Sequence, residues 1–235
     1  MRPTASLAMF VSLCTTSALA ADPPQNEPAP KDGVTRVACV GDSITFGSGI
    51  ADREKNSYPA VLDELLGEAY DVRNFGVGGA TAQKRGDKPY WTLDEFKDVS
   101  EFNPHIVVIK LGTNDTKPQN WQDAKLFEID MQALVNHFTE LPEKPQVFVC
   151  TPVPVHKDAF GIREEVVRDE VVPTVKEVAK RMEAPLIDLY AALKEDAAMF
   201  PDGVHPNAAG AKKIAENIAA AIKKSVDKGK TRQAE

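Results

Sequence analysis

The chain has 235 residues, a formal net charge of −7 and a hydrophobic content of 43%. This acidic balance, without a basic patch, argues against nucleic acid as a partner. Once the terminal segments described next are set aside, about 200 residues remain, which fits one domain with a single core.

The N-terminus has the pattern of a secretory signal peptide over residues 1–20. Arg2 precedes a short apolar run at residues 7–13, and Ala18-Leu19-Ala20 is a small-residue cleavage site. The run is shorter than the roughly 20 apolar residues that a membrane-spanning helix needs. We therefore expect cleavage after Ala20 and export to the periplasm or the cell exterior, with no stable membrane insertion afterwards.

The mature chain divides into three parts by composition. Residues 21–33 are rich in proline and polar side chains, which predicts an extended linker. Residues 34–226 carry the patterns of a folded domain. Residues 227–235 are polar and are expected to form a frayed tail. Nothing in the sequence indicates the oligomeric state.

Short β-branched runs recur through the domain. Two of them, residues 106–109 and 147–149, are almost continuously apolar, which is typical of strands covered on both faces in a parallel sheet. The five expected strands are residues 36–40, 71–74, 106–111, 147–150 and 186–187.

Helical patterns separate these strands. Helices are expected at residues 57–68, 122–138, 164–182 and 208–226. Pro173 lies inside the third of them and predicts a kink or break near Val172. Strand–helix alternation over this length predicts right-handed βαβ units in a three-layer α/β/α domain.

Cys39 and Cys150 each end an expected strand. Export would favour a disulfide, but a third strand is expected between the two. Next-nearest strands lie roughly 9–10 Å apart, and bridging needs Cα atoms within about 7 Å. We therefore expect two buried free thiols without a nucleophilic role.

The candidate functional residues lie in the loops that follow the strands. In open parallel sheets, ligands bind at the carboxyl ends of the strands. The segments expected at this edge are residues 41–45, 74–81, 112–115 and 151–154, together with Asp202 and His205 before the last helix.

Three of these side chains are parts of acyl-transfer chemistry. Ser43 follows a buried strand at a helix start, His205 precedes Pro206 at the start of the last helix, and Asp202 sits in an Asp-Gly turn. They suit a nucleophile, a base and the group that orients the base. The serine does not lie in a G-x-S-x-G elbow. Residue by residue, an ordinary N-cap serine and a turn aspartate remain open alternatives.

Two further segments could stabilise an oxyanion. The glycine-rich residues 74–81 allow close backbone approach, so the N–H of Gly79 is a candidate donor beside that of Ser43. The side chain of Asn114 is a third candidate. The alternatives are a tight turn and an Asx-turn, respectively.

The remaining histidines suggest no metal site. His105 begins a strand and His137 ends a helix, so both are expected to be structural, whereas His156 is expected to line the pocket. No i, i+4 histidine pair or cysteine cluster is present. We expect no metal and no cofactor.

Taken together, four ordered blocks resemble the SGNH (GDSL-type) hydrolase superfamily. The blocks are Gly41-Asp42-Ser43-Ile44-Thr45, residues 74–81 with Gly79, Gly112-Thr113-Asn114-Asp115, and Asp202-Gly203-Val204-His205-Pro206. The resemblance covers roughly residues 35–226 and implies a flavodoxin-like sheet of order 2-1-3-4-5. It also implies a serine esterase with Ser43, His205 and Asp202 as triad, and Ser43, Gly79 and Asn114 as oxyanion hole. In the serine block, Ile44 stands where the family's namesake has leucine.

The substrate expected from this resemblance is a short acyl ester of a carbohydrate, because the blocks look like those of exported carbohydrate acetylesterases. We expect Asp42, Tyr90, Trp91 and His156 to line the pocket. The rings of Tyr90, Trp91 and Trp121 are candidate platforms for sugars, with core or rim packing as the alternative, which is favoured slightly for Trp121. The lack of a long apolar lid argues mildly against long-chain lipids. A lysophospholipase or thioesterase, an acyltransferase and a non-catalytic saccharide-binding protein remain alternatives.

Overall fold

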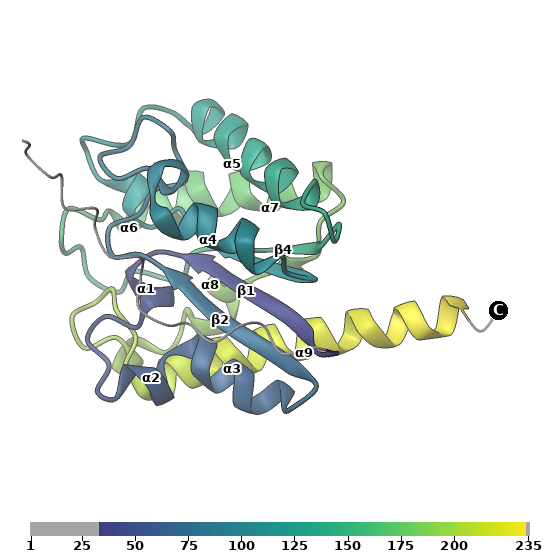
Figure 1. Cartoon of the computed structure of the whole chain (residues 1–235). Helices are drawn as coiled ribbons and strands as arrows, with labels where there is room; N and C mark the ends of the chain where they lie inside the picture. The colour runs from purple at the N-terminus through teal and green to yellow at the C-terminus, as the bar shows by residue number, and fades with distance from the viewer. Residues whose placement is uncertain (1–32, 234–235) are drawn as a thin grey trace, which may run out of the picture.

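Five parallel strands form the central sheet of the computed structural model, which describes residues 33–233 (Figure 1). The strands are β1 Thr35–Gly41, β2 Tyr70–Gly76, β3 Ile106–Lys110, β4 Gln146–Cys150 and β5 Leu186–Ile187. Their order, β2-β1-β3-β4-β5, confirms the predicted sheet. The predicted signal peptide and all of the predicted linker except Gly33 lie outside the described residues.

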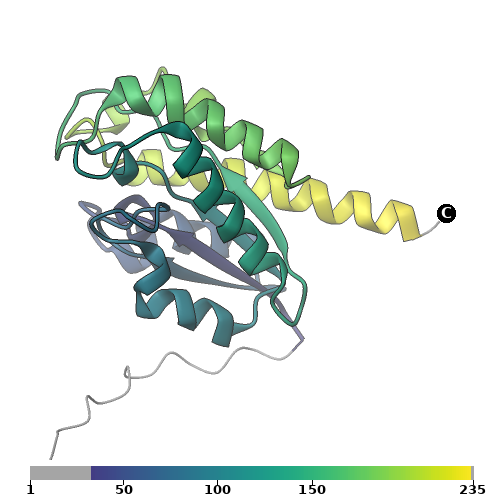
Figure 2. The same ribbon diagram turned by 90° about the horizontal axis from the view of Figure 1, so that it is seen from above.

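Helices cover both faces of the sheet (Figures 1 and 2). One layer holds α4 Asp94–Phe102, α5 Ala124–Thr139 and α7 Val172–Arg181, and the other holds α3 Tyr58–Leu66, α8 Leu189–Leu193 and α9 Ala208–Gln233. Shorter helical segments sit mainly in the loops: α1 Ser43–Phe46, α2 Arg53–Asn56, α6 Glu164–Val166, η1 Tyr90–Thr92, η2 Asn114–Thr116, η3 Val167–Val171 and η4 Ala197–Met199. None of the helices within residues 33–233 has the length and apolar content that a membrane crossing requires.

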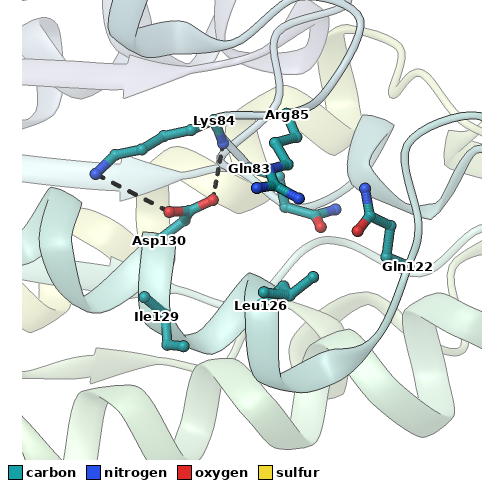
Figure 3. Close-up of a pocket in the computed structure, with 7 residues that line it drawn as sticks. All are labelled: Gln83, Lys84, Arg85, Gln122, Leu126, Ile129 and Asp130. Atoms are coloured by element: carbon teal, nitrogen blue, oxygen red, sulfur yellow. Dashed lines mark hydrogen bonds and ion pairs between the residues drawn. The ribbon is translucent and has the colours of Figure 1, made fainter.

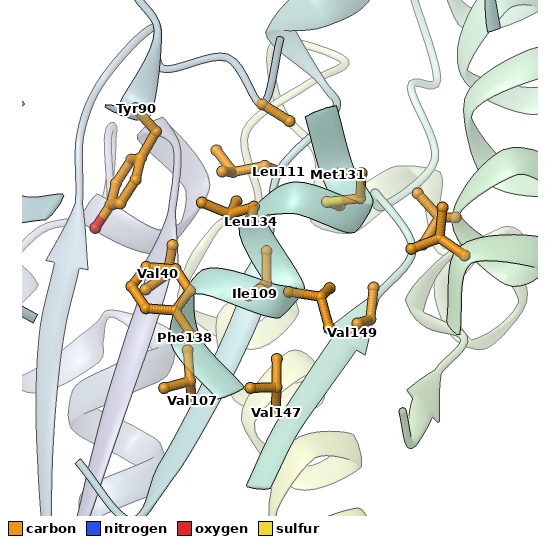
Figure 4. Packing of buried hydrophobic residues seen from close by; sticks show 14 of the residues in the cluster. Val40, Tyr90, Val107, Ile109, Leu111, Met131, Leu134, Phe138, Val147 and Val149 are labelled. Atoms are coloured by element: carbon orange, nitrogen blue, oxygen red, sulfur yellow. The ribbon is translucent and has the colours of Figure 1, made fainter. Parts of the chain in front are cut away.

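Two apolar clusters separate along the strands because successive side chains point to opposite faces. Ala38 and Val40 of β1 pack with the α4, α5 and α7 layer, whereas Val37 and Cys39 pack with α3 and α9. Figure 4 shows the first cluster, in which Val107 and Ile109 of β3 meet Leu134 and Phe138 of α5. All five residues of β3 are buried; the first four form its continuous apolar run, and the fifth is Lys110.

The kink or break predicted near Val172 takes the form of an irregular turn within a continuous run of helical backbone. Residues Val167–Val171 form a wider π-type turn between α6 and α7, and Pro173 lies in the first turn of α7. A proline lacks the N–H that would continue the preceding hydrogen-bond pattern, and the wider turn directly before it accommodates this loss. The local irregularity therefore lies where the sequence predicted it.

Two features differ from expectation. The last helix continues to Gln233 instead of ending near Val226. Extending an existing helix by further residues is much less costly than starting a new one. Helix α4 was also not predicted: it has only nine residues, and its apolar stripe consists of Phe96, Val99 and Phe102. This helix supplies the crossover between β2 and β3.

Cys39 and Cys150 are buried free thiols, as predicted. They lie on β1 and β4, and β3 separates these two strands. Burial raises the pKa of the Cys150 thiol to about 12 and that of Cys39 further still. Neither thiol is therefore a ready nucleophile.

Candidate active site

The side chains of Asp202, His205 and Ser43 form one continuous hydrogen-bonded chain. Nε2 of His205 lies 2.9 Å from the Ser43 hydroxyl, and Nδ1 lies 2.8 Å from Asp202 Oδ2. Ser43 and His205 are 162 positions apart in the sequence. The structure thus brings together the three residues that the sequence singled out.

The Asp202 carboxylate is held by the turn that it begins. Its Oδ1 accepts hydrogen bonds from the backbone N–H groups of Val204, at 2.8 Å, and His205, at 2.7 Å. Burial alone would raise the pKa of Asp202, but these two bonds and the contact with the imidazole outweigh it and lower the pKa. An ionised carboxylate only accepts, so His205 must carry its proton on Nδ1 and present a lone pair on Nε2 to Ser43.

Gly203 is required at the centre of this turn. Its φ of +87° lies in the left-handed region, and a Cβ at this position would come within 2.7 Å of the Lys157 Cβ and 2.8 Å of the Lys157 carbonyl oxygen. Its own carbonyl accepts a hydrogen bond from the backbone N–H of His156 at 2.8 Å. The loop after β4 therefore fixes the turn that presents His205.

Ser43 is the first residue of α1, directly after β1. The preceding Asp42 caps this helix: its Oδ1 accepts the N–H of Ile44 at 2.9 Å. First-turn N–H groups of a helix have no acceptor within the helix. The N–H of Ser43 is one of these and lies beside its own hydroxyl, as an oxyanion donor should.

Gly79 lies in a tight turn after β2. The N–H of Ala80 donates to the carbonyl of Val77 at 3.1 Å, and the φ of Gly79 is +84°. Among the described residues, none accepts a hydrogen bond from the Gly79 N–H. This group is therefore free to bind an oxyanion.

Asn114 begins the short helix η2 after β3 and is 3% exposed. Its Nδ2 donates to the carbonyl of Ala80 at 3.1 Å, which leaves the second proton of the amide for another acceptor. Nδ2 of Asn120 in turn donates to the carbonyl of Asn114 at 2.9 Å. The two loops that carry the candidate donors are therefore joined to each other.

Asp115, beside Asn114, fixes the far side of the glycine loop. Its carboxylate accepts the backbone N–H groups of Ala82, at 3.0 Å, and Gln83, at 2.8 Å. Burial raises its pKa to about 6 despite these bonds. No role was predicted for Asp115 from the sequence, because its partners lie more than 30 positions away.

Two residues that we expected to line the substrate pocket lie in the interior instead. Tyr90 has no exposed surface, and its hydroxyl donates to the Phe75 carbonyl at 2.7 Å. Asp42 is equally buried, with the Lys110 ammonium 3.0 Å from each of its carboxylate oxygens. A fully buried ring or carboxylate cannot contact a substrate, so both expectations are corrected.

Trp91 and His156 are half-buried and already have partners. The Trp91 indole N–H donates to the carbonyl of Ala82 at 2.9 Å, and the Lys84 ammonium lies 4.2 Å from its ring centroid. The His156 ring packs against Phe200, with 4.9 Å between centroids. These contacts hold both rings in place, although the buried Nε2 of His156 has no hydrogen-bond partner among the described residues. A place for either side chain in the pocket stays a prediction.

Phe160 lies beside the triad and was not predicted from the sequence. Its side chain is 62% exposed, and its ring centroid is 5.3 Å from that of His205. The loop that carries it is tied to η2, because Nε of Arg163 donates to the carbonyl of Thr116 at 2.6 Å. An isolated Phe-Gly in a loop was the only signal for it in the sequence.

A small cavity of about 180 Å³ lies away from the triad, between the loop after Ala82 and helix α5 (Figure 3). Its walls contain none of the triad or candidate oxyanion-hole residues; they are Gln83, Lys84, Arg85, Gln122, Leu126, Ile129 and Asp130. Asp130 joins the two walls, since its Oδ2 accepts the backbone N–H of Lys84 at 2.8 Å.

The other histidines contribute to packing. Nδ1 of His105 accepts the backbone N–H of Arg36 at 2.9 Å, and the ring of His137 stacks on Phe96 with 4.4 Å between centroids. Within the part of the chain that the structure describes, no group of three or more His, Cys, Asp or Glu side chains is arranged to hold a metal ion.

Comparison with known proteins indicates the family of this chain. Residues 39–213 match the GDSL-like Lipase/Acylhydrolase family. Over 214 residues, 83% of this chain, the sequence is 43% identical to an acetylxylan esterase of Xylanibacter ruminicola, and it spans about half of that relative, 45% of its length.

Solved structures show the same fold. A carbohydrate acetylesterase from Sinorhizobium meliloti superposes with a TM-score of 0.68 at 20% identity, covering 80% of this chain and 98% of that one. The inhibitor-bound aryl esterase of M. smegmatis gives a TM-score of 0.69 at 20% identity, with 81% and 99% covered. The chain belongs to the GDSL-like lipase/acylhydrolase family of ester hydrolases, as its four sequence blocks predicted.

Proposed function

We propose that this chain is an exported serine esterase that removes short acyl groups, chiefly acetyl, from carbohydrates. The observation that carries the proposal is the hydrogen-bonded chain from Asp202 through His205 to Ser43. The acetylxylan esterase relative supports an acetylated xylan as the first substrate to test.

In the first step, Ser43 Oγ attacks the acyl carbon while Nε2 of His205 accepts the hydroxyl proton. Asp202 keeps the imidazole in the required tautomer and stabilises the imidazolium that forms. His205 then passes the proton to the sugar oxygen, which leaves as an alcohol. The acyl group remains on Ser43 as an ester.

The developing oxyanion would bind to the N–H groups of Ser43 and Gly79 and to Nδ2 of Asn114. Neither Gly79 N–H nor the second amide proton of Asn114 has an acceptor among the described residues. Donors that are already oriented need no reorganisation when charge develops, which is why such sites lower the barrier. Water then attacks the acyl carbon while Nε2 of His205 accepts its proton. His205 returns this proton to Ser43 Oγ as the bond to the acyl group breaks and the acid leaves.

Phe160 supplies a surface for the alcohol part of the substrate. It is exposed, lies next to His205 and is apolar, as the aromatic walls of ligand sites commonly are. The pattern of residues 1–20 supports export, where a polymeric carbohydrate would be accessible.

An acyl-length series tests the proposal. Wild-type protein and the Ser43→Ala and His205→Ala variants would be assayed with p-nitrophenyl acetate, octanoate and palmitate, and for acetate release from acetylated xylan and O-acetylated sialosides. We expect a preference for acetyl esters and loss of turnover in both variants. Ser100→Ala, which removes a hydroxyl from α4, is the matched control.

Other outcomes would select the alternatives. A strong preference for palmitate would favour a lysophospholipase or thioesterase. Transfer of acetyl to an added alcohol would favour an acyltransferase. Glycan binding with activity unaffected by Ser43→Ala would favour a binding protein.

A further inference from the structure

The peptide group between Gly78 and Gly79 has two polar groups with different functions. Its N–H, on Gly79, is the second oxyanion donor of the proposed mechanism, and its carbonyl, on Gly78, points elsewhere. In a planar trans peptide, the C=O and N–H bonds point in opposite directions. The orientation of the carbonyl therefore determines where the donor points.

The surrounding turn leaves this orientation weakly determined. The Ala80-to-Val77 hydrogen bond closes a four-residue turn in which Gly79 has φ +84° and Gly78 has no positive φ, which is a type II turn. Types I and II differ mainly in the direction of the central peptide group. With glycine at both central positions, neither side chain opposes a flip that would turn the Gly79 N–H away from the oxyanion.

Lys88 holds the carbonyl of this peptide. Its Nζ donates to the Gly78 oxygen at 3.0 Å. Among the described residues, no carboxylate pairs with Lys88. Its nearest acidic neighbour in sequence, Asp87, is engaged by the side-chain amides of Gln119 and Asn120, both at 3.0 Å.

The backbone of Lys88 is fixed in register with the same loop. The N–H of Thr81 donates to the Lys88 carbonyl at 2.9 Å, and the N–H of Tyr90 donates to the Thr81 carbonyl at 3.0 Å. The Lys88 stem also covers Gly79, because a Cβ on that glycine would lie 3.7 Å from Lys88 Cδ. The backbone of this loop and the side chain of Lys88 are therefore both held against the Gly78–Gly79 peptide group.

We propose that Lys88 is a positioning residue for the oxyanion hole: its ammonium holds the Gly78–Gly79 peptide in the orientation that aims the Gly79 N–H at the substrate. The proposal rests on the proposed function, in which Gly79 is an oxyanion donor. A charge-assisted hydrogen bond to the carbonyl also polarises the peptide and strengthens its N–H as a donor. In this role Lys88 acts through the peptide group and not by direct contact with the substrate or Ser43.

The test compares Lys88→Met and Lys88→Arg with Lys84→Met. Lys84 lies on the same loop, but its ammonium lies 4.0 Å from the Asp130 carboxylate, as Figure 3 shows, and also contacts the Trp91 ring.

The kinetic effect is measured with p-nitrophenyl acetate. Loss of an oxyanion donor costs about 10²–10³-fold in kcat, so loss of the group that orients this donor should cost about ten-fold. We expect this loss in Lys88→Met with KM changed less than about two-fold, because ground-state binding is unaffected. Lys88→Arg should recover most of the activity, and Lys84→Met should match the wild type.

A double-mutant cycle with Gly79→Ala adds a readout that general destabilisation would not give. Alanine at φ +84° favours the flipped peptide without a clash. If Lys88 acts through this peptide, the losses in Gly79→Ala and Lys88→Met should combine to less than their product. Thermal unfolding midpoints of all variants establish that each is folded.

Three results would overturn the proposal. These are a raised KM at unchanged kcat in Lys88→Met, a kcat equal to that of Lys84→Met, or fully multiplicative losses in the cycle. Ser43→Ala, assayed in parallel, separates this failure from that of the proposed function. If Ser43→Ala retains turnover, the esterase mechanism itself is wrong, whereas if it is inactive the mechanism stands and only the role of Lys88 is rejected.

Discussion

The carboxylate of Asp42 and the ammonium of Lys110 form an ion pair with no solvent exposure, next to the nucleophile in the chain. Nζ of Lys110 lies 3.0 Å from each carboxylate oxygen, and 3.4 Å from the hydroxyl of Thr113. Asp42 caps the helix that Ser43 begins, and Thr113 precedes Asn114. One buried pair therefore connects the loop of the nucleophile with the loop of a candidate oxyanion donor.

Removing one charge of this pair should be costly. Asp42→Asn keeps an acceptor for the N–H of Ile44 but leaves the Lys110 ammonium buried without a counter-charge. Breaking a buried pair in this way costs about 3–5 kcal/mol of unfolding free energy. Urea denaturation measures it, with Asp169→Asn as control, because the Arg168–Asp169 side chains are 51% and 54% exposed and their pair should contribute at most about 1 kcal/mol. A loss no larger than that of the control would contradict the expectation.

The sheet was predictable because its signal is local. Strands such as β3 are buried on both faces and therefore appear in the sequence as apolar runs. Pro173 likewise indicates the position of the irregular turn before α7. The strand order, by contrast, came from the resemblance carried by the four blocks. Short α4 was missed because three apolar positions in nine residues do not make a distinct helical pattern.

The triad was predictable for a different reason: its chemistry needs specific residue types at strand ends. Partners far apart in sequence were not predictable. Tyr90 and Asp42 were expected to face the substrate, yet each is buried by a partner that no local pattern reveals, the Phe75 carbonyl and the Lys110 ammonium. Phe160 was not predicted, because a loop has no periodicity that would show which side chain reaches His205.

Asp202→Asn tests the tautomer argument. The asparagine oxygen can still accept the N–H groups of Val204 and His205, but its NH₂ would then face Nδ1 of His205. The imidazole would carry its proton on Nε2 and could no longer accept the Ser43 proton, so we expect kcat to fall by about 10⁴-fold. Asp123→Asn is a matched control, because Asp123 only caps α5 and asparagine caps equally well. A loss below about ten-fold would exclude the orienting role.

Asn114→Ala removes the third candidate oxyanion donor. Loss of a single side-chain donor of this kind lowers kcat by about 10²–10³-fold with little change in KM. The variant also loses the hydrogen bond to the Ala80 carbonyl, so its unfolding free energy must be measured alongside. A decrease in kcat of ten-fold or less in a folded variant would remove Asn114 from the proposed hole.

Phe160→Ala tests whether this exposed ring contacts the alcohol part of the substrate. Loss of roughly 0.7–1.4 kcal/mol of aromatic contact should raise KM for an acetylated xylo-oligosaccharide about three- to ten-fold. Ethyl acetate, which is too small to cover the ring, should show an unchanged kcat/KM. Ile129→Ala removes an apolar side chain of similar exposure, 50%, from α5 and serves as control. Equal effects on both substrates would mean that Phe160 acts only on His205.

Asp115 should make stability depend on pH in a defined window. Its pKa is raised from 3.8 to about 6 by burial, so between these values the native state retains a proton that the unfolded state has released. The unfolding free energy therefore falls as pH rises through this window, by up to about 1.4 kcal/mol per pH unit, and it stays lower above the window.

The Asp115→Asn variant isolates this contribution. Its side chain cannot titrate, so the unfolding free energy of the wild type minus that of the variant contains the pH dependence of Asp115. We expect the difference, measured by urea denaturation from pH 4 to 8, to favour the wild type increasingly as pH falls below about 6 and to be flat above about 7. A difference that instead grows with pH would mean that the N–H groups of Ala82 and Gln83 stabilise the carboxylate more than burial destabilises it.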